Sequence, residues 1–469
     1  MSDNKFKVEF TLKQHTPIIH FQSDQSGATL RATELKPKLD RFLIEKVFNG
    51  KNNKQNYEKY LIDKDKDAFN YKIKIDYPLE KHELDIISPL FFGNMGSGVK
   101  KKSKKYNQTF KIEFQSLKHY ELIEIIKNNF PTFLAKTNFG MRQTKGFGSF
   151  YLDESSKFYI PIEKTVNDIY YLEIQSTDPK KIDETIKYFW TRFKSGINLN
   201  FNNQCKNPYE KSFSFKYLDD KNITNDSEDK LNWDKRWIKE TFFGAQKNNQ
   251  EAVFLRAYLG LSSTYTYKKT DEPCNQNKKL KLEDDYQIEV YGETIKRIQS
   301  PLTFKPIIGT NSTKIFMIPN QIKIPDDCKF YFIKRFNFVY EDTSRDSKIK
   351  FKKELYPEID ISENASQNKQ NNKLKKFEGT KDKSINNKFD YSKQFSRFES
   401  FLQDFCTINN QGLHIPKKYE LQAPKNFSFL HMYSKYLESL DSNFDAQYNV
   451  PKQPIQKINV QIKKVGVIL

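Results

Sequence analysis

The order in which apolar residues repeat along the first 152 residues is the strongest constraint on the fold of this chain. Residues 6–12 alternate apolar and polar, which is the pattern of a half-buried strand, and residues 35–47 place apolar side chains on one helical face. Two more alternating segments and a second helical segment follow, and a loop rich in glycine leads into a last strand. These later segments are residues 71–75, 110–114, 119–130 and 147–152.

This β-α-β-β-α-β order is that of a ferredoxin-like, or RRM-like, unit. The chain then begins a similar pattern, because residues 170–174 alternate and residues 182–193 form an amphipathic helical pattern. We therefore predict an α+β fold of two tandem ferredoxin-like domains, the second of them elaborated by later segments. Those segments include an expected helix near 251–261 and expected strands around 287–291, 314–318 and 330–338.

Composition divides the chain into four parts. Residues 341–388 lose periodicity and fill with Lys, Asn, Ser, Asp and Glu, so they cannot bury enough apolar surface to fold by themselves. Helical periodicity returns near residue 395. We predict a ferredoxin-like domain at 1–160, a second domain at 161–340, a low-complexity basic linker or insertion at 341–390, and a helical segment and final strand at 391–469 that complete the second domain.

The glycine-rich loop over residues 139–150 is the most distinctive local motif. The chain has only 16 glycines, yet Gly140, Gly146 and Gly148 lie within nine positions, interleaved with Arg142 and Lys145. Glycine permits positive φ and lets a backbone lie close to a ligand, and flanking cations favour an anionic ligand such as a phosphate. The alternative is a flexible turn that leads into a strand.

The net charge points to an anionic partner. Lys and Arg total 79 against 59 Asp and Glu, a formal net charge of +20. Nucleic acid is the usual partner for an excess of this size. A general bias of the sequence towards Lys and Asn explains part of the excess, although acidic residues normally rise with such a bias.

Several other classes of protein are not indicated. The four cysteines are far apart and form no CxxC pair, so neither a zinc site nor a disulfide framework is expected. No apolar run approaches the ~20 residues that a membrane span requires. The aspartate pairs lie in no recognisable metal motif, and no P-loop or nucleophile elbow is present. We expect a cytoplasmic protein with no metal, no cofactor and no membrane partner.

Two histidines after the first strand offer an enzymatic alternative. His15 and His20 are five residues apart, and imidazole titrates near working pH, so the pair could act as general base and general acid in metal-independent RNA cleavage. The other interpretation is a pair of ordinary loop or core histidines. We therefore assign no catalytic residue and favour a binding protein over an enzyme.

Two segments resemble a known family. Residues 28–36, ATLRATELK, open the first helix, and residues 140–149, GMRQTKGFGS, precede the last strand. With the first strand, they resemble the RAMP superfamily of CRISPR-associated proteins, and most of all the tandem-domain subunit of type III-B (Cmr) effector complexes. That subunit lies at the end of the assembly distant from the guide's 5′ handle. The resemblance implies paired ferredoxin-like domains and RNA binding by the glycine-rich loop.

The resemblance also implies partners and site residues. It implies a role in antiviral defence, with CRISPR guide RNA, target RNA and other RAMP subunits as partners. Some RAMP relatives cleave guide precursors, which keeps the endoribonuclease with His15 and His20 as the alternative. Basic side chains at a helix N-terminus add phosphate contacts, so we predict RNA binding by both the helix head and the loop; the alternative is a solvated basic surface. The predicted RNA-binding residues are Arg31, Lys36, Gly140, Arg142, Lys145, Gly146 and Gly148.

Overall fold

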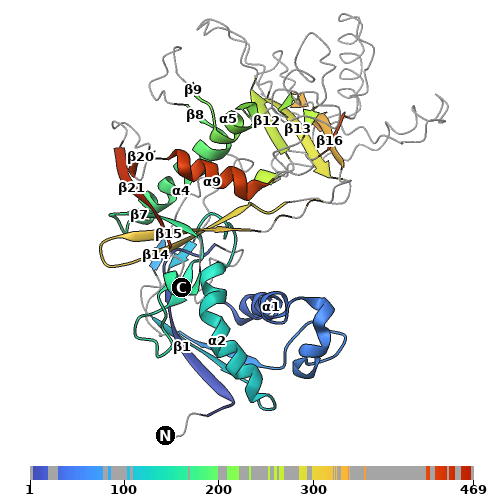
Figure 1. Cartoon of the computed structure of the whole chain (residues 1–469), viewed down its shortest axis with the longest axis vertical. Coiled ribbons are helices and arrows are strands. Elements are labelled where there is room, and N and C mark those ends of the chain that lie inside the picture. The colour runs from blue at the N-terminus through green and yellow to red at the C-terminus, as the bar shows by residue number, and fades with distance from the viewer. Residues whose placement is uncertain are drawn as a thin grey trace, which may run out of the picture.

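The structure is a computed structural model, and it describes most of the first 198 residues and separate parts of the remainder. Figure 1 shows β1, α1 and α2 at one end, the sheet containing β7, β14 and β15 in the middle, and β12, β13 and β16 at the other end. The described residues are 4–19, 30–77, 83–85, 103–105, 109–166, 169–198, 209–220, 232–233, 252–253, 258–260, 264–268, 285–292, 298–320, 322, 324, 329–335, 337–338, 353–354, 419–422, 428–440, 443–448 and 456–465.

The first sheet has the strand order of a ferredoxin-like unit. Its order is β2-β5-β1-β6, so the second, third, first and fourth strands of the β-α-β-β-α-β unit lie side by side, and every pair is antiparallel. A short hairpin, β3 with β4, interrupts the chain between β2 and β5. The elements are β1 (Lys7–Gln14), α1 (Ala32–Phe42), β2 (Lys72–Asp76), β3 (Glu83–Asp85), β4 (Ser103–Lys105), β5 (Phe110–Gln115), α2 (Tyr120–Lys136) and β6 (Phe150–Leu152).

Alternation along β1 explains how this sheet acquires its core. Val8, Phe10 and Leu12 are buried, and the residues between them are more exposed. Phe10 meets Phe114 of β5 edge to face at 5.9 Å and Phe130 of α2 at 4.8 Å, which joins the sheet to the helix. The strand periodicity thus fixes which face the helices cover.

A π-helical turn (Leu43–Val47) and two 3₁₀ turns (Lys51–Asn56 and Glu58–Tyr60) follow α1.

A second sheet repeats this order. It runs β14-β15-β7-β21-β20, which again places the second, third, first and fourth strands side by side, with β20 added at the edge. The helices α4 and α9 supply buried residues to the same core as β7 and β15. The prediction of tandem ferredoxin-like units is confirmed. The elements are α3 (Ile162–Thr165), β7 (Tyr170–Ile174), α4 (Pro179–Lys194), β14 (Leu302–Ile308), β15 (Thr313–Pro319), α9 (Phe429–Ser439), β20 (Asn443–Tyr448) and β21 (Gln456–Lys464).

A six-stranded sheet elaborates the second unit, with the order β10-β11-β19-β16-β13-β12. The expected strand near 287–291 and residues 330–335 of the one near 330–338 belong to it, whereas residues 337–338 pair with β18 in a separate sheet. The expected helix near 251–261 is contradicted at residues 252–253, which form a strand, and residues 251, 254–257 and 261 lie outside the described part of the chain. A short apolar run cannot be assigned to helix or strand by periodicity alone. The remaining elements are β8 (Ile197–Asn198), β9 (Tyr209–Glu210), α5 (Phe213–Asp220), β10 (Asn232–Trp233), β11 (Ala252–Val253), β12 (Thr264–Lys268), β13 (Asp285–Gly292), β16 (Lys329–Arg335), β17 (Asn337–Phe338), β18 (Lys353–Glu354) and β19 (Tyr419–Gln422).

The two ferredoxin-like units share buried surface. Ile315 and Met317 of β15 belong to the core of the second unit, whereas Phe316 and Ile318 on the other face of the strand belong to the core of the first. Val465, directly after β21, joins that first core as well. The second sheet is therefore covered by its own helices on one face and, in part, by the first unit on the other.

Candidate functional site

The glycine-rich loop forms a closed hairpin between α2 and β6. Asn138 and Ser149 form an isolated antiparallel bridge, and the Phe139 N–H donates to the Gly148 carbonyl at 2.9 Å. The segment after β1 lies against this hairpin, because the Gly148 N–H donates to the Pro17 carbonyl at 2.8 Å and the Thr16 hydroxyl to the Gly146 carbonyl at 2.6 Å. The loop therefore has a defined conformation.

Positive φ favours glycine at all three positions of the loop, and at Gly140 and Gly148 a close contact with backbone requires it. All have positive φ: +79° at Gly140, +88° at Gly146 and +65° at Gly148. A Cβ on Gly148 would lie 1.9 Å from the Phe139 carbonyl oxygen, and one on Gly140 would lie 2.7 Å from the Ile19 carbonyl oxygen. At Gly146 it would lie 2.8 Å from Ile186 Cδ1 of α4. At all three positions, the atoms closest to the place of a Cβ belong to the protein itself.

Helix α1 holds one side of the loop. Glu34 Oε1 accepts a hydrogen bond from the Gly140 N–H at 2.7 Å and forms an ion pair with the Lys38 ammonium at 2.8 Å. The Lys38 ammonium also donates to the Asn138 carbonyl and to Gln143 Oε1, at 3.0 and 2.9 Å. A carboxylate and an ammonium one helical turn apart thus bridge the helix and the loop. Sequence reasoning did not single out either residue.

The two predicted residues at the head of α1 differ in their surroundings. Arg31 is the N-cap residue and is half-buried, and its side chain makes no capping hydrogen bond. The Lys36 ammonium donates to Asp40 at 2.9 Å and to the Phe69 carbonyl at 2.7 Å, and it lies 3.9 Å from the centre of the Tyr71 ring. Burial lowers the pKa of Lys36, although Asp40 acts in the opposite direction. Lys36 is therefore engaged in contacts within the first unit.

Strand β14 of the second unit holds the other side of the loop. The Asn138 amide donates to the Phe304 carbonyl at 2.8 Å, and the Ser149 hydroxyl to the Pro306 carbonyl at 2.7 Å. The fully buried Lys305 ammonium donates to the carbonyls of Thr137 and Phe150, each at 2.8 Å. Burial lowers the pKa of Lys305 well below its usual value. A lysine within the apolar run LTFKPII was the sequence signal that could have indicated this contact.

The two cations of the loop have unequal charge at neutral pH. Arg142 is half-buried with φ +57°, and burial lowers its pKa to about 10 while Asp183 acts in the opposite direction, so it stays protonated. Lys145 is partly exposed, but its ammonium lies 4.5 Å from the centre of the Trp190 ring, and burial lowers its pKa to about 7, with Lys194 contributing. The loop thus carries one permanent cation and one that titrates near neutrality.

The histidine alternative gains no support from the geometry. His15 is 4% exposed, and its Nδ1 accepts a hydrogen bond from the Ile308 N–H at 2.9 Å. That nitrogen is engaged by β14, and the ring is buried where the first unit meets the second. His20 lies outside the described residues.

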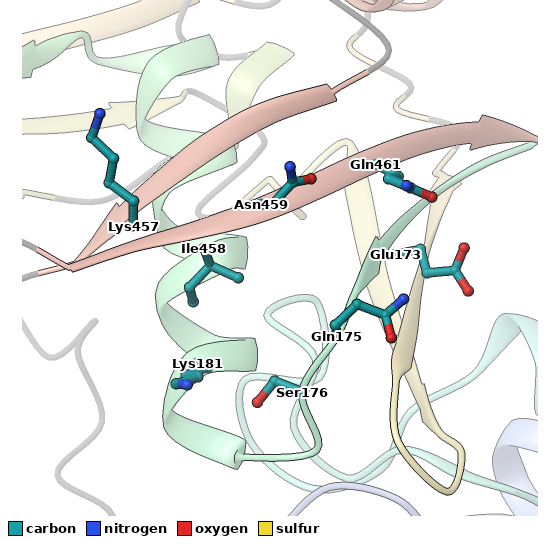
Figure 2. Close-up of a pocket in the computed structure, with 8 residues that line it drawn as sticks. All are labelled: Glu173, Gln175, Ser176, Lys181, Lys457, Ile458, Asn459 and Gln461. Atoms are coloured by element: carbon teal, nitrogen blue, oxygen red, sulfur yellow. The ribbon is translucent and has the colours of Figure 1, made fainter.

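A polar hollow of about 330 Å³ lies in the second unit, where the end of β7 and the beginning of β21 approach the start of α4. Figure 2 shows the Asn459 and Gln461 side chains on β21 and the Gln175 side chain beside β7. Lys181 and Lys457 also line it, and Glu173 at its rim pairs with Lys463 of β21. Amides of this kind can form hydrogen bonds with many ligands, so the hollow does not by itself indicate one.

The described part of the chain offers neither a metal site nor a membrane span. Among those residues, no three His, Cys, Asp or Glu side chains come close enough together to bind a metal ion. No described helix combines the length and the apolar character needed to cross a bilayer.

Comparisons with known proteins identify two consecutive family domains. The family model of the Cmr1 N-terminal domain matches residues 5–197, and that of the Cmr1 C-terminal domain matches residues 209–464. No curated protein sequence matches the chain.

The similarity to solved structures is weak. Cmr1 from Pyrococcus furiosus in its apo form is 10% identical, with a TM-score of 0.34, over 68% of this chain and 90% of that one. A chain of the type III-B Cmr-beta complex bound to cognate target RNA is 16% identical, with a TM-score of 0.25, over 32% of this chain. The match spans 58% of the length of that Cmr-beta chain.

Proposed function

The chain belongs to the Cmr1 family, and from this premise we propose that it is an RNA-binding subunit of a type III-B CRISPR effector complex. In this role it holds guide RNA, or the duplex of guide and target RNA, beside other RAMP subunits in antiviral defence. The observation that carries the proposal is the pair of family matches, which together cover both ferredoxin-like units. The net charge of +20 supports a polyanionic partner.

Arg31 and Arg142 are the predicted contacts that we place at the RNA. Both are half-buried arginines, and Arg142 lies beside the loop segment that α1 holds through Glu34. Guanidinium groups suit phosphate because they donate several hydrogen bonds in a planar fork. Lys145 contributes less charge at neutral pH, since its pKa is about 7. The three glycines shape the loop, and the Lys36 ammonium is held by Asp40 and the Phe69 carbonyl, away from the loop.

Purification of the tagged full chain from its own cells, followed by sequencing of the retained RNA and identification of the retained proteins, tests the proposed role. We expect repeat-derived guide RNA together with other RAMP subunits. An RNA-free chain with no such subunits would contradict the role in a CRISPR complex.

A binding measurement tests the two arginines. Fluorescence anisotropy with a labelled guide RNA should show about tenfold weaker binding for the Arg31→Gln/Arg142→Gln variant, and a shallower dependence of affinity on salt. Arg41 and Lys118 are exposed cations of the same unit, so Arg41→Gln/Lys118→Gln removes equal charge elsewhere and serves as the control. Equal affinities of the two double variants would reject Arg31 and Arg142 as contacts.

A further inference from the structure

A second hollow, of about 460 Å³, lies between α4, α5 and α9 of the second unit. Its volume falls within the range of about 300–1,000 Å³ that is common for small-molecule sites. No residue of the glycine-rich loop lines it. The residues that determine its chemistry are Arg192, Lys211, Phe213, Lys216, Tyr217 and Lys435.

Aromatic rings form one wall of this hollow. Phe213 of α5 stacks on the buried Phe193 of α4, with 6.3 Å between ring centres and 14° between planes, and it lies 5.0 Å from the buried Tyr436 of α9. Tyr217, one turn later on α5, lies 6.1 Å from Phe213. Phe213 and Tyr217 are both only half-buried. The rings therefore form a continuous series, from the buried Phe193 and Tyr436 to Phe213 and Tyr217, which line the hollow.

Cations surround these rings. Arg192 pairs with Glu210 at 3.3 Å, and Lys435 pairs with Glu438 at 2.7 Å, so these two cations are balanced. Lys211 and Lys216 are exposed, and the Lys211 ammonium lies 4.8 Å from the centre of the Phe215 ring. Within the described part of the chain, neither lysine has a carboxylate at ion-pair distance. Two lysines thus give the hollow an excess of positive charge beside two half-exposed rings.

We propose that this hollow is a second RNA site, which binds one unpaired nucleotide of a single-stranded segment. The base stacks on Phe213 and Tyr217, and Lys211 and Lys216 contact the adjoining phosphates. Proteins that bind single-stranded RNA combine such rings with cations, because every base has a π-face and every linkage a negative charge. This inference rests on the proposed function, since it requires RNA as the partner, but it uses none of the residues placed at the glycine-rich loop.

The test uses the full chain and a short oligouridine RNA that carries fluorescein for anisotropy, or 5-iodouridine for photocrosslinking. Tyr217→Leu should weaken binding about tenfold, because base stacking is lost, and Tyr217→Phe should retain wild-type affinity. Lys211→Gln/Lys216→Gln should reduce the slope of log affinity against log salt by about 1.4, or ~0.7 for each phosphate contact with a single strand. Lys72→Gln/Lys118→Gln removes two exposed lysines from the first unit and is the matched control.

Crosslinking separates failure of this site from failure of the proposed function. Crosslinks from iodouridine to Phe213 or Tyr217, lost in Tyr217→Leu, support the site. RNA binding that depends on Arg31 and Arg142 but is unchanged by the Tyr217 and Lys211/Lys216 variants overturns the site and leaves the proposed function intact. Absence of any RNA binding overturns both. If the Tyr217 and Lys211/Lys216 variants bind RNA normally but lose a co-purifying protein subunit, the proposed nucleotide site is also overturned. The hollow is then a surface that binds a protein.

Discussion

At the scale of single residues, Gly148 shows why the loop needs glycine. Gly148 combines φ +65° with a Cβ position 1.9 Å from the Phe139 carbonyl oxygen, so alanine there requires the hairpin to open. We expect Gly148→Ala to lower the free energy of unfolding by more than about 3 kcal/mol. Gly50→Ala is the control, because Gly50 has φ +94° and a Cβ added there would have no atom within 4 Å. With φ +94° and ψ 173°, Gly50 has a backbone conformation almost confined to glycine, so strain alone should cost Gly50→Ala about 1–3 kcal/mol.

Urea unfolding of the two glycine variants measures this difference. Equal losses of stability would mean that positive φ, and not the contact with Phe139, is what requires glycine at position 148. The fold could then accommodate a side chain inside the hairpin.

Lys145 makes stability depend on pH. Its pKa of about 7 in the folded state lies below its ordinary 10.5, so the unfolded chain binds more protons between those values. The free energy of unfolding should therefore rise with pH through this window. Relative to Lys145→Met, the wild type should gain about 1 kcal/mol between pH 7 and 9, a value reduced for partial exposure.

Urea titrations at pH 7, 8 and 9 check this prediction, with Lys118→Met as the control for loss of an exposed lysine. Parallel profiles for the wild type and Lys145→Met would show that the Lys145 ammonium is solvated, and not enclosed against Trp190.

At the scale of elements, α1 acts as a support for the loop. Glu34 accepts from the Gly140 N–H and binds Lys38, which in turn reaches Asn138 and Gln143. Removal of the carboxylate leaves the Gly140 N–H without its acceptor and takes away the ion-pair partner of Lys38, which keeps its bonds to Asn138 and Gln143. We expect Glu34→Ala to raise amide hydrogen exchange in residues 139–147 about tenfold, measured by mass spectrometry.

A matched variant keeps this test specific. Glu124 of α2 pairs with Lys127 on the helix surface, so Glu124→Ala removes an intrahelical ion pair that does not contact the loop. If both variants left exchange of the loop unchanged, the loop would be held by β14 and the segment after β1 alone.

The elements also show which parts of the fold were predictable. Alternation in residues 6–12 and the helical period before residue 130 reflect burial by near neighbours, so β1 and α2 follow from local pattern. The strand expected at 147–152 is shorter, because Gly148 has φ +65° and Ser149 pairs with Asn138 in the hairpin of the glycine-rich loop. Lys305 bonds to carbonyls 155 and 168 residues away. Contacts at such separation leave no periodic signal in the sequence.

The RNA site was likewise predictable in part from local sequence, whereas the rest of it depends on distant contacts. Its glycines and cations stand out by composition, and the structure does bring Gly140, Arg142 and Lys145 together in one hairpin. What composition could not give is the second unit against which the hairpin packs. The enclosure of His15 and the low pKa of Lys145 both depend on that packing.

At the scale of the whole molecule, the two units should open together. Asn138 and Ser149 donate to β14, and Phe316 and Ile318 of the second sheet complete the core of the first unit. Separation of the units would expose these apolar side chains and leave the Lys305 ammonium without its acceptors. We therefore expect β5 in the first unit and β14 in the second to exchange their amides through one opening reaction of equal free energy.

Native-state hydrogen exchange over a series of low urea concentrations measures this coupling. In the wild type, the exchange free energies of β5 and β14 should merge as urea rises. Asn138→Ala/Ser149→Ala removes two of the hydrogen bonds between the units and should make the values diverge, by about 1–3 kcal/mol. Ser155→Ala is the control, because its hydroxyl donates to Asp153 within the same turn of the first unit. Separate exchange of β5 and β14 in the wild type would mean that each unit is stable alone, and that the contacts between the glycine-rich loop and β14 do not couple them.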